Sequence, residues 1–203
     1  MKEMTNYSKI EIIFKNNGGF ITRKDVDDAN IPSWFLSSFV NQNHLKKIAP
    51  GFYANNEYIT DDYCILQRRF PQYIFTGMSA LYLLGLTDKI PDYIEVCAPQ
   101  NYHPSRKKIA SLIIRKTSNI DVYKLGIREV ETMFGNVVFT YDEEKTICDI
   151  IKHRDRYDSE TFIKAIKLYV KKVNNHIKLF NYAKKLGIEK KVYEVIEIMA
   201  NEN

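Results

Sequence analysis

Cysteine is scarce in this 203-residue chain, and its three cysteines, Cys64, Cys97 and Cys148, lie far apart in the sequence. An odd number of cysteines without a CxxC pair fits neither a disulfide framework nor a zinc site. Reduced thiols in the cytosol are the simplest interpretation. We therefore expect a cytoplasmic protein that needs no structural metal and no other cofactor.

Long apolar runs are also missing. Nowhere do 18 apolar residues follow one another, so we expect no membrane-spanning helix. The N-terminal sequence MKEMTNYSKIEIIFKNN lacks the apolar segment of a signal peptide. The phosphate-binding loop GxxxxGK[ST], the dinucleotide motif GxGxxG and the hydrolase motif GxSxG do not occur. The composition, 45% hydrophobic and 27% charged, is that of an ordinary globular protein of one or two domains.

Positive charge is only slightly in excess over negative charge. The net charge is +5, which is compatible with nucleic-acid binding without being diagnostic of it. Residues 1–60 carry seven lysine or arginine and six acidic side chains, fewer cations than a strong electrostatic DNA binder has. The most basic part of the chain lies nearer the C-terminus, at Lys164, Lys167, Lys171, Lys172, Lys178, Lys184, Lys185, Lys190 and Lys191. A basic helical face there could bind DNA, RNA or an acidic partner, or could simply be solvated.

The first sixty residues read as short helices and extended segments. Apolar residues at helical spacing predict a helix that Asn16–Gly19 ends. After a short extended piece, the sequence of Thr22–Asp25 resembles a capping box and begins a second helix. A third helix begins at Ile31-Pro32. Two extended arms around Ala49-Pro50-Gly51 then form a hairpin, and this order is that of a winged helix-turn-helix with the hairpin as the wing.

The third helix carries the residues expected to read DNA. One stripe is apolar, and the opposite stripe is short, polar and uncharged, with a single aromatic ring. Serine and asparagine can donate hydrogen bonds to phosphates or base edges. The residues predicted to face the major groove are Ser33, Trp34, Ser37, Ser38 and Asn41. Equally, the Trp34 ring could fold back on the core and the serine face could merely be solvated.

Phosphate contacts are expected from two neighbouring places. Lys46, Lys47 and the Gly51 backbone belong to the hairpin. Arg23 and Lys24 begin the second helix, where backbone amides and positive charge together favour an anion. A plain packing module could have the same succession of elements, in which case the segment would be a protein–protein adaptor.

The rest of the chain predicts a mixed α/β domain with a helical C-terminal region, so the fold class is α+β. We expect helices over 61–70, 76–86, from 142 and over about 158–200, and strands over 93–98, 111–116 and 136–141. The predicted domains are 1–57 and 61–203, joined near residues 55–61.

Two places could support metal-dependent chemistry. Asp149 and His153 are one helical turn apart among the acids of residues 142–158, although these acids equally suit a helix start and ion pairs such as Lys145–Asp149. Asp92 and Glu95 resemble the acids of a restriction-type nuclease, but Cys97 stands where such enzymes have lysine. A DNA nuclease that uses the 92–97 strand or the 142–158 cluster is therefore the alternative to a protein without catalysis.

Three blocks of the sequence resemble one family. FITRKDVDDANIPSWFLSSFVNQNHLKKIAPGFYAN (20–55) is similar to the N-terminal winged helix of AbiEi-type antitoxins. LQRRFPQYIFTGMSALYLLGLTDKIPDYIEVCAP (66–99) and ETMFGN followed by YDEEKTICDIIKHR (131–136 and 141–154) resemble later blocks of that family. The resemblance thus covers nearly the whole chain.

The resemblance to AbiEi-type antitoxins implies a specific function, DNA site and partner. Such a protein is the antitoxin of a bicistronic abortive-infection, or phage-defence, module of type IV. Its winged helix binds inverted repeats in the promoter and represses its own operon. Its C-terminal domain neutralises a nucleotidyltransferase-like toxin without needing a stable complex. It is a monomer in solution, and two copies bind the operator cooperatively.

The resemblance matches residues 32–43 to the recognition helix and residues 45–54 to the wing. Pro50 departs from the family pattern, because a basic residue is expected before the wing glycine. That loss directs attention to the C-terminal lysines as a second DNA or partner surface, represented by Lys171, Lys172, Lys184 and Lys185.

Overall fold

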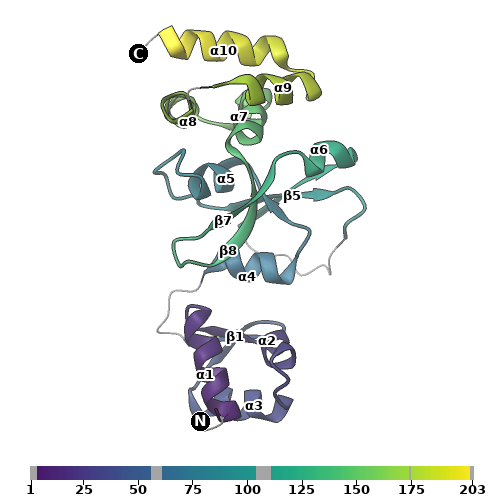
Figure 1. Ribbon diagram of the computed structural model, residues 1–203, viewed down its shortest axis with the longest axis vertical. Helices are drawn as coiled ribbons and strands as arrows, with labels where there is room; N and C mark the ends of the chain where they lie inside the picture. The colour runs from purple at the N-terminus through teal and green to yellow at the C-terminus, as the bar shows by residue number, and fades with distance from the viewer. Residues whose placement is uncertain (1–3, 56–60, 104–110, 174, 202–203) are drawn as a thin grey trace. The chain divides into compact units, whose positions relative to one another are not determined.

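The computed structural model describes residues 4–55, 61–103, 111–173 and 175–201, drawn in Figure 1. The chain divides into two compact units, Met1–Ile65 and Leu66–Asn203. Most of the predicted linker, residues 56–60, lies outside the described residues. The predicted boundary at residues 57–61 therefore stays a prediction.

The N-terminal unit combines three helices with a small antiparallel sheet. Its elements are α1 (Asn6–Asn16), β1 (Phe20–Thr22), α2 (Arg23–Asp28), α3 (Ser33–Gln42), β2 (Lys46–Ala49) and β3 (Phe52–Ala54). The strand order is β1-β3-β2, so the hairpin β2–β3 is completed by the strand that precedes α2. The buried residues of the three helices, among them Ile10, Phe14, Val26, Leu36 and Phe39, form one hydrophobic core.

Local signals set where these helices begin and end. The Thr22 hydroxyl accepts the Asp25 backbone N–H at 3.0 Å, and the Asp25 carboxylate accepts the Thr22 N–H at 2.8 Å. This completes the predicted capping box at the start of α2, with aspartate in place of glutamate. Asn30, at φ +54°, then turns the chain from α2 towards α3, and asparagine tolerates that left-handed conformation better than most residues.

The C-terminal unit is built around a mixed five-stranded sheet. The strands are β4 (Ile74–Phe75), β5 (Ile94–Pro99), β6 (Leu112–Thr117), β7 (Ile127–Glu131) and β8 (Val137–Tyr141). Their order is β6-β5-β4-β8-β7; β5 with β6 and β4 with β8 are parallel, and the other pairs are antiparallel. The strands expected over 93–98, 111–116 and 136–141 are confirmed as β5, β6 and β8. The sequence prediction missed β4, the edge strand β7 and the short helix α6 (Ile120–Lys124).

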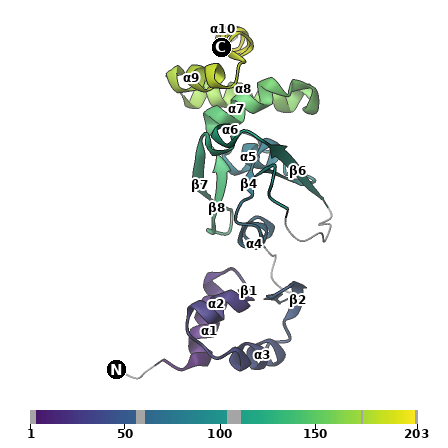
Figure 2. The same ribbon diagram turned by 90° about the vertical axis from the view of Figure 1, so that its right-hand side faces the viewer.

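Helices cover this sheet on both sides. They are α4 (Asp62–Arg69), which begins at the end of the first unit, α5 (Gly77–Leu83), α7 (Glu143–Lys152), the 3₁₀ turn η1 (Arg154–Arg156), α8 (Ser159–Lys172), α9 (Ile177–Lys185) and α10 (Glu189–Asn201). Figures 1 and 2 show α7 to α10 gathered at the end that carries the C-terminus, with α4 across the sheet from them. The apolar faces of α5 and of α7 to α10 form the main core, with residues such as Leu81, Ile147, Ile166, Leu179 and Val192.

The fold class is thus α+β, with helices and two sheets, as predicted. Within the described part of the chain, no helix is long and apolar enough to cross a membrane.

Candidate nucleic-acid interface

Helix α3 has one buried face and one open face. Leu36 and Phe39 are only 4% and 2% exposed and point into the core. On the other side Ser33, Ser37 and Asn41 are exposed, and Trp34 is 61% exposed, with its ring stacked on Phe35 at 3.7 Å between centroids. The interpretation in which Trp34 folds back into the core is therefore wrong. The predicted polar stripe with one aromatic ring is accessible to a ligand.

The end of this stripe differs slightly from the prediction. Ser38 is half-buried, and its hydroxyl accepts a hydrogen bond from the Gln42 side chain at 3.1 Å. Gln42 itself is exposed and extends the open face by one position. The sequence prediction missed Gln42, although it lies eight residues after Trp34 and so continues the same helical spacing. Glutamine, like asparagine, can pair with adenine in the major groove.

Several contacts hold α3 firmly on the core. The Asn43 side-chain amide donates to the Phe39 carbonyl at 2.9 Å and to the Tyr7 hydroxyl of α1 at 3.1 Å. The Phe39 ring lies 5.3 Å from the ring of Tyr7 and 5.6 Å from that of Phe14, in tilted and edge-on arrangements. The open face of α3 is therefore presented in one orientation, as a site that reads a shape requires.

The hairpin places its two lysines on opposite faces. Lys46 pairs with Ala54, and Lys47 pairs with Tyr53, before a bulge at Ile48. Because successive strand residues point to opposite sides, these two exposed side chains leave the hairpin in opposite directions. Tyr53 packs against the helical core, so Lys47 leaves on the side where the helices lie. The strand register therefore does not favour the prediction that both lysines contact the same stretch of the phosphate backbone.

The start of α2 is less open to an anion than expected. The Arg23 N–H donates to the Gly51 carbonyl at the hairpin turn at 3.0 Å, and the Asp25 N–H is taken by the capping box. The Arg23 guanidinium also lies 3.5 Å from the Asp27 carboxylate. The prediction that backbone amides at this helix start bind phosphate is therefore wrong for these two amides. The side chains of Arg23 and Lys24 remain exposed and can still contact a phosphate.

Comparison with known proteins agrees with this geometry. Residues 8–56 match the model of a family described as transcriptional regulator, AbiEi antitoxin. Over this segment the chain is therefore similar to AbiEi antitoxins. The match runs from within α1 to the end of β3 and includes every residue of the α3 face and the hairpin.

The whole fold has a counterpart among solved structures. The crystal structure of the RV2827C protein from Mycobacterium tuberculosis aligns with 89% of this chain and 72% of its own, with a TM-score of 0.52 and 14% identity. At that identity the likeness shows a shared fold only. No curated protein matches this chain.

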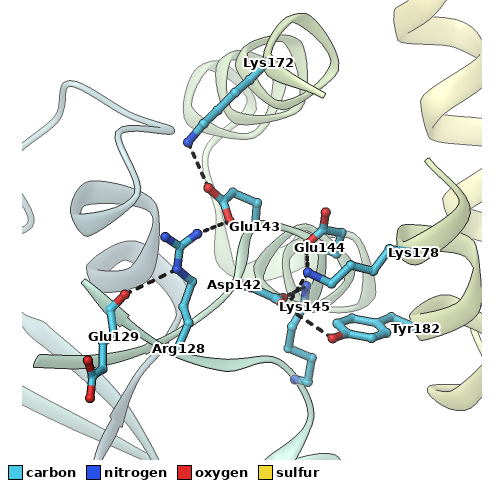
Figure 3. Close-up of polar contacts among 9 residues, drawn as sticks. All are labelled: Arg128, Glu129, Asp142, Glu143, Glu144, Lys145, Lys172, Lys178 and Tyr182. Carbon is cyan, nitrogen blue, oxygen red and sulfur yellow. Dashed lines mark hydrogen bonds and ion pairs between the residues drawn. The ribbon is translucent and has the colours of Figure 1, made fainter. Parts of the chain in front are cut away.

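Beyond the AbiEi segment, the predicted basic surface of the C-terminal unit is partly neutralised. Lys172 of α8 binds the Glu143 carboxylate at 2.8 Å, and Arg128 of β7 binds its other oxygen at 2.9 Å. Figure 3 shows Glu143 between these two cations. Lys164 likewise pairs with Asp88 at 2.6 Å. Lys164 and Lys172 are therefore paired with acids and are not free cations of a basic surface.

A second set of contacts joins α9 to the start of α7. Lys178 lies 3.0 Å from Asp142 and 2.8 Å from Glu144, and the Tyr182 hydroxyl donates to Asp142 at 3.2 Å (Figure 3). Asp142 also caps α7 by accepting the Lys145 N–H. Asp142, Glu143 and Glu144 of the predicted 142–158 cluster thus hold α8, α9 and β7 to the start of α7 rather than collect around a ligand.

Burial and charge act in opposite directions on Glu143. Burial raises the pKa of this carboxyl, but the hydrogen bond from Lys172 and the charges of Lys172 and Arg128 outweigh it and leave the pKa below its usual value. A carboxyl whose pKa is lowered by folding stabilises the fold above its unfolded pKa. That stabilisation is lost as the pH falls through the lowered value.

The three other predicted surface lysines differ from Lys172. Lys171, Lys184 and Lys185 are exposed and form no ion pair with a described residue. Lys171 and Lys172 are adjacent, so they form a matched pair for mutation.

We expect Lys172→Gln to destabilise the C-terminal unit by about 1 kcal/mol, between the values typical of exposed and of buried ion pairs. Lys171→Gln should change stability by less than about 0.5 kcal/mol. Urea unfolding of both variants measures the difference. Equal stabilities of the two variants would show that the ion pair between Lys172 and Glu143 does not stabilise the fold.

The nuclease alternative finds little support. Glu95 is 2% exposed, and its carboxylate accepts the Arg115 Nε–H at 2.6 Å and the Met78 N–H at 3.2 Å. Asp149 pairs with Lys145 at 2.5 Å, as the non-catalytic interpretation predicted. Asp92 is exposed and precedes β5. Among the described residues, no three histidine, cysteine, aspartate or glutamate side chains are placed to hold a metal ion.

Proposed function

We propose that this protein is a DNA-binding repressor and antitoxin without catalysis of its own. In this proposal the N-terminal unit is a winged helix-turn-helix, α3 is its recognition helix and β2–β3 is its wing. The observation that carries the proposal is the open face of α3, which is polar and uncharged, anchored on the core and followed by a hairpin with exposed lysines. The AbiEi match over the same residues supports it.

The chemistry of this face suits reading of base edges in the major groove. The groove, about 12 Å wide, admits one α-helix. Short hydroxyl and amide side chains on α3 can approach the bases closely and exchange hydrogen bonds with them. The cations come from the neighbouring elements, at Arg23, Lys24 and Lys47, and would contact the backbone on either side.

The remaining parts of the proposal concern regulation and the partner. We propose that two copies bind inverted repeats in the promoter of the protein's own operon and repress it, each copy being a monomer in solution. The C-terminal unit would neutralise a nucleotidyltransferase-like toxin, functionally and without the need for a stable complex, in the cytoplasm. The family description supports the combination of antitoxin and regulator.

Fluorescence anisotropy tests DNA binding directly. The full chain is titrated with the duplex upstream of its own gene and with a scrambled duplex, across a salt series and with chelator present. We expect selective binding that chelator does not change, with a slope of log affinity against log salt of about −3 per chain, because about three cations meet phosphates. Weak and equal binding to both duplexes would contradict the proposal and favour the adaptor interpretation.

The same experiment separates a repressor from a nuclease. A nuclease would cleave the duplex, lose that activity with chelator and lose it again in Glu95→Gln. Intact DNA after incubation with Mg²⁺, together with selective binding, is the result that the proposal requires.

The two hairpin lysines should contribute unequally to DNA affinity. We expect Lys47→Gln to weaken binding about fivefold at every DNA sequence and to reduce the salt slope by about 1, because Lys47 leaves the hairpin on the side of α3. Lys46→Gln is the matched control, with the same loss of charge on the opposite face, and should change binding less than twofold. Equal effects of the two substitutions in the anisotropy titration would refute this assignment of faces.

A further inference from the structure

A second polar site lies entirely within the C-terminal unit, between the sheet and α7. A cavity of about 180 Å³ opens there. Its walls come from β5 and β6, from the C-terminal half of α7 and from the turn η1 that follows. None of the residues proposed to contact DNA or to form the second basic surface lines it.

The floor of the cavity holds two ion pairs. Glu95, almost fully buried, is paired with Arg115 at 2.6 Å. Lys145, whose side chain is 4% exposed, is paired with Asp149 at 2.5 Å, and its ammonium lies over the Tyr141 ring at 4.5 Å. Each pair is neutral as a whole, so the floor supplies oriented polar groups and no net charge.

The rim of the cavity is different, because two more cations lie there without a matching acid. Lys152 and Arg156 are exposed and form no ion pair with any described residue. Lys116 also borders the cavity, but its ammonium donates to the carbonyls of Pro99, Gln100 and Tyr102 at the end of β5, and its side chain leaves β6 on the face opposite that of Arg115. Asp155, the acid beside Arg156, is exposed and does not line the cavity. The lining therefore has two positive charges in excess.

Two further donors, His153 and Arg115, complete the site. His153 lies in the lining next to Arg156, and burial together with the Arg156 charge lowers the pKa of its imidazole, so the ring is neutral at pH 7 and can donate one hydrogen bond. Arg115 uses its Nε–H on Glu95, while its two terminal amino groups can still donate. Guanidinium groups, ammonium groups and an imidazole around one concave space are the donors that bind phosphate in proteins.

We propose that this cavity binds a phosphate-bearing small molecule, either inorganic phosphate or a nucleoside monophosphate. A phosphate dianion would compensate the two excess charges at the rim while the two ion pairs on the floor stay intact. The cavity is smaller than the roughly 300–1,000 Å³ of pockets that hold drug-sized ligands, which favours a small anion or one end of a nucleotide. This goes beyond DNA binding and toxin neutralisation, because it gives the C-terminal unit a ligand of its own.

The experiment follows the His153 imidazole by NMR in the full chain during titration with sodium phosphate. Sodium chloride at matched ionic strength is the reference, because phosphate also stabilises proteins non-specifically. We expect a saturable shift of the His153 resonances with a millimolar or lower dissociation constant, whereas the exposed His44 should show no saturable shift. A parallel titration with a nucleoside 5′-monophosphate separates the two sources: tighter binding identifies a nucleotide, and equal or weaker binding identifies phosphate.

Variants locate the site and make the proposal refutable. Arg156→Gln and Lys152→Gln should each weaken phosphate binding about five- to tenfold, as expected for loss of one charge-assisted contact. Lys190→Gln, an exposed lysine of α10 outside the lining, should leave it unchanged. The proposal is overturned if the His153 shift does not saturate by about 20 mM, or if both cavity variants bind phosphate as the wild type does. Neither result bears on DNA binding by the N-terminal unit.

Discussion

Replacing Ser37 with glutamate is expected to weaken operator binding by about 30-fold or more and to leave the fold intact. Ser37 is exposed in the middle of the open face of α3, so a larger side chain meets no packed neighbour there. A carboxylate at that place would lie among DNA phosphates and acceptor groups, and such like-charge contact costs about 2 kcal/mol or more. Anisotropy with the upstream duplex measures the loss, and circular dichroism checks the fold.

Ser118→Glu is the matched control for that substitution. It adds the same negative charge at an exposed position of the C-terminal unit, outside the AbiEi segment. We expect its DNA affinity to fall less than threefold, because only the net charge changes. If both variants bind DNA alike, the open face of α3 does not meet DNA, and the adaptor interpretation becomes the better one.

Replacing Gly77 with alanine is expected to destabilise the C-terminal unit by about 4 kcal/mol or more. Gly77 has φ +54°, and a Cβ atom there would lie 2.0 Å from one carboxylate oxygen of Glu95 and 2.5 Å from its carboxylate carbon. Glu95 cannot move away without losing Arg115 and the Met78 N–H, and breaking a buried pair costs about 3–5 kcal/mol. The left-handed backbone adds about 1–2 kcal/mol. Urea unfolding gives the value.

Gly85→Ala separates the cost of a left-handed backbone from the cost of displacing the Glu95 carboxylate. Gly85 has φ +67°, and nothing lies within 4 Å of a Cβ atom at that position. Alanine there should cost only the backbone strain, about 1–2 kcal/mol. Equal losses at the two glycines would mean that the Glu95 carboxylate moves aside freely, and the close packing around it would then count for little.

Much of the N-terminal unit could be predicted from the sequence, because its signals are local. The capping box joins Thr22 to Asp25, three residues apart, and the buried and open faces of α3 follow from helical spacing. The match to AbiEi antitoxins over residues 8–56 confirms the resemblance seen in the same segment. Gln42 was missed only because the stripe was ended one position early.

The C-terminal unit was harder to predict, because its decisive contacts join residues far apart in the chain. β4 has two residues, too few for a periodic pattern, and it is a strand only because β5 and β8 lie on either side of it. The sequence of a basic helix is the same whether its lysines are free or paired. The pairing of Lys172 with Glu143, 29 residues earlier, therefore could not be predicted from the residues near Lys172. The bond between Glu95 and Arg115 depends in the same way on the parallel register of β5 and β6.

The sequence by itself therefore determined the class of the fold, the helix starts and the polar face of α3, since these depend on residues within a few positions of one another. Only the tertiary structure decided that Trp34 faces solvent, that Lys46 and Lys47 leave opposite faces and that four cations converge on one cavity. Those features depend on which distant segments pack together, and packing is set by the burial of whole surfaces rather than by any short stretch of the chain.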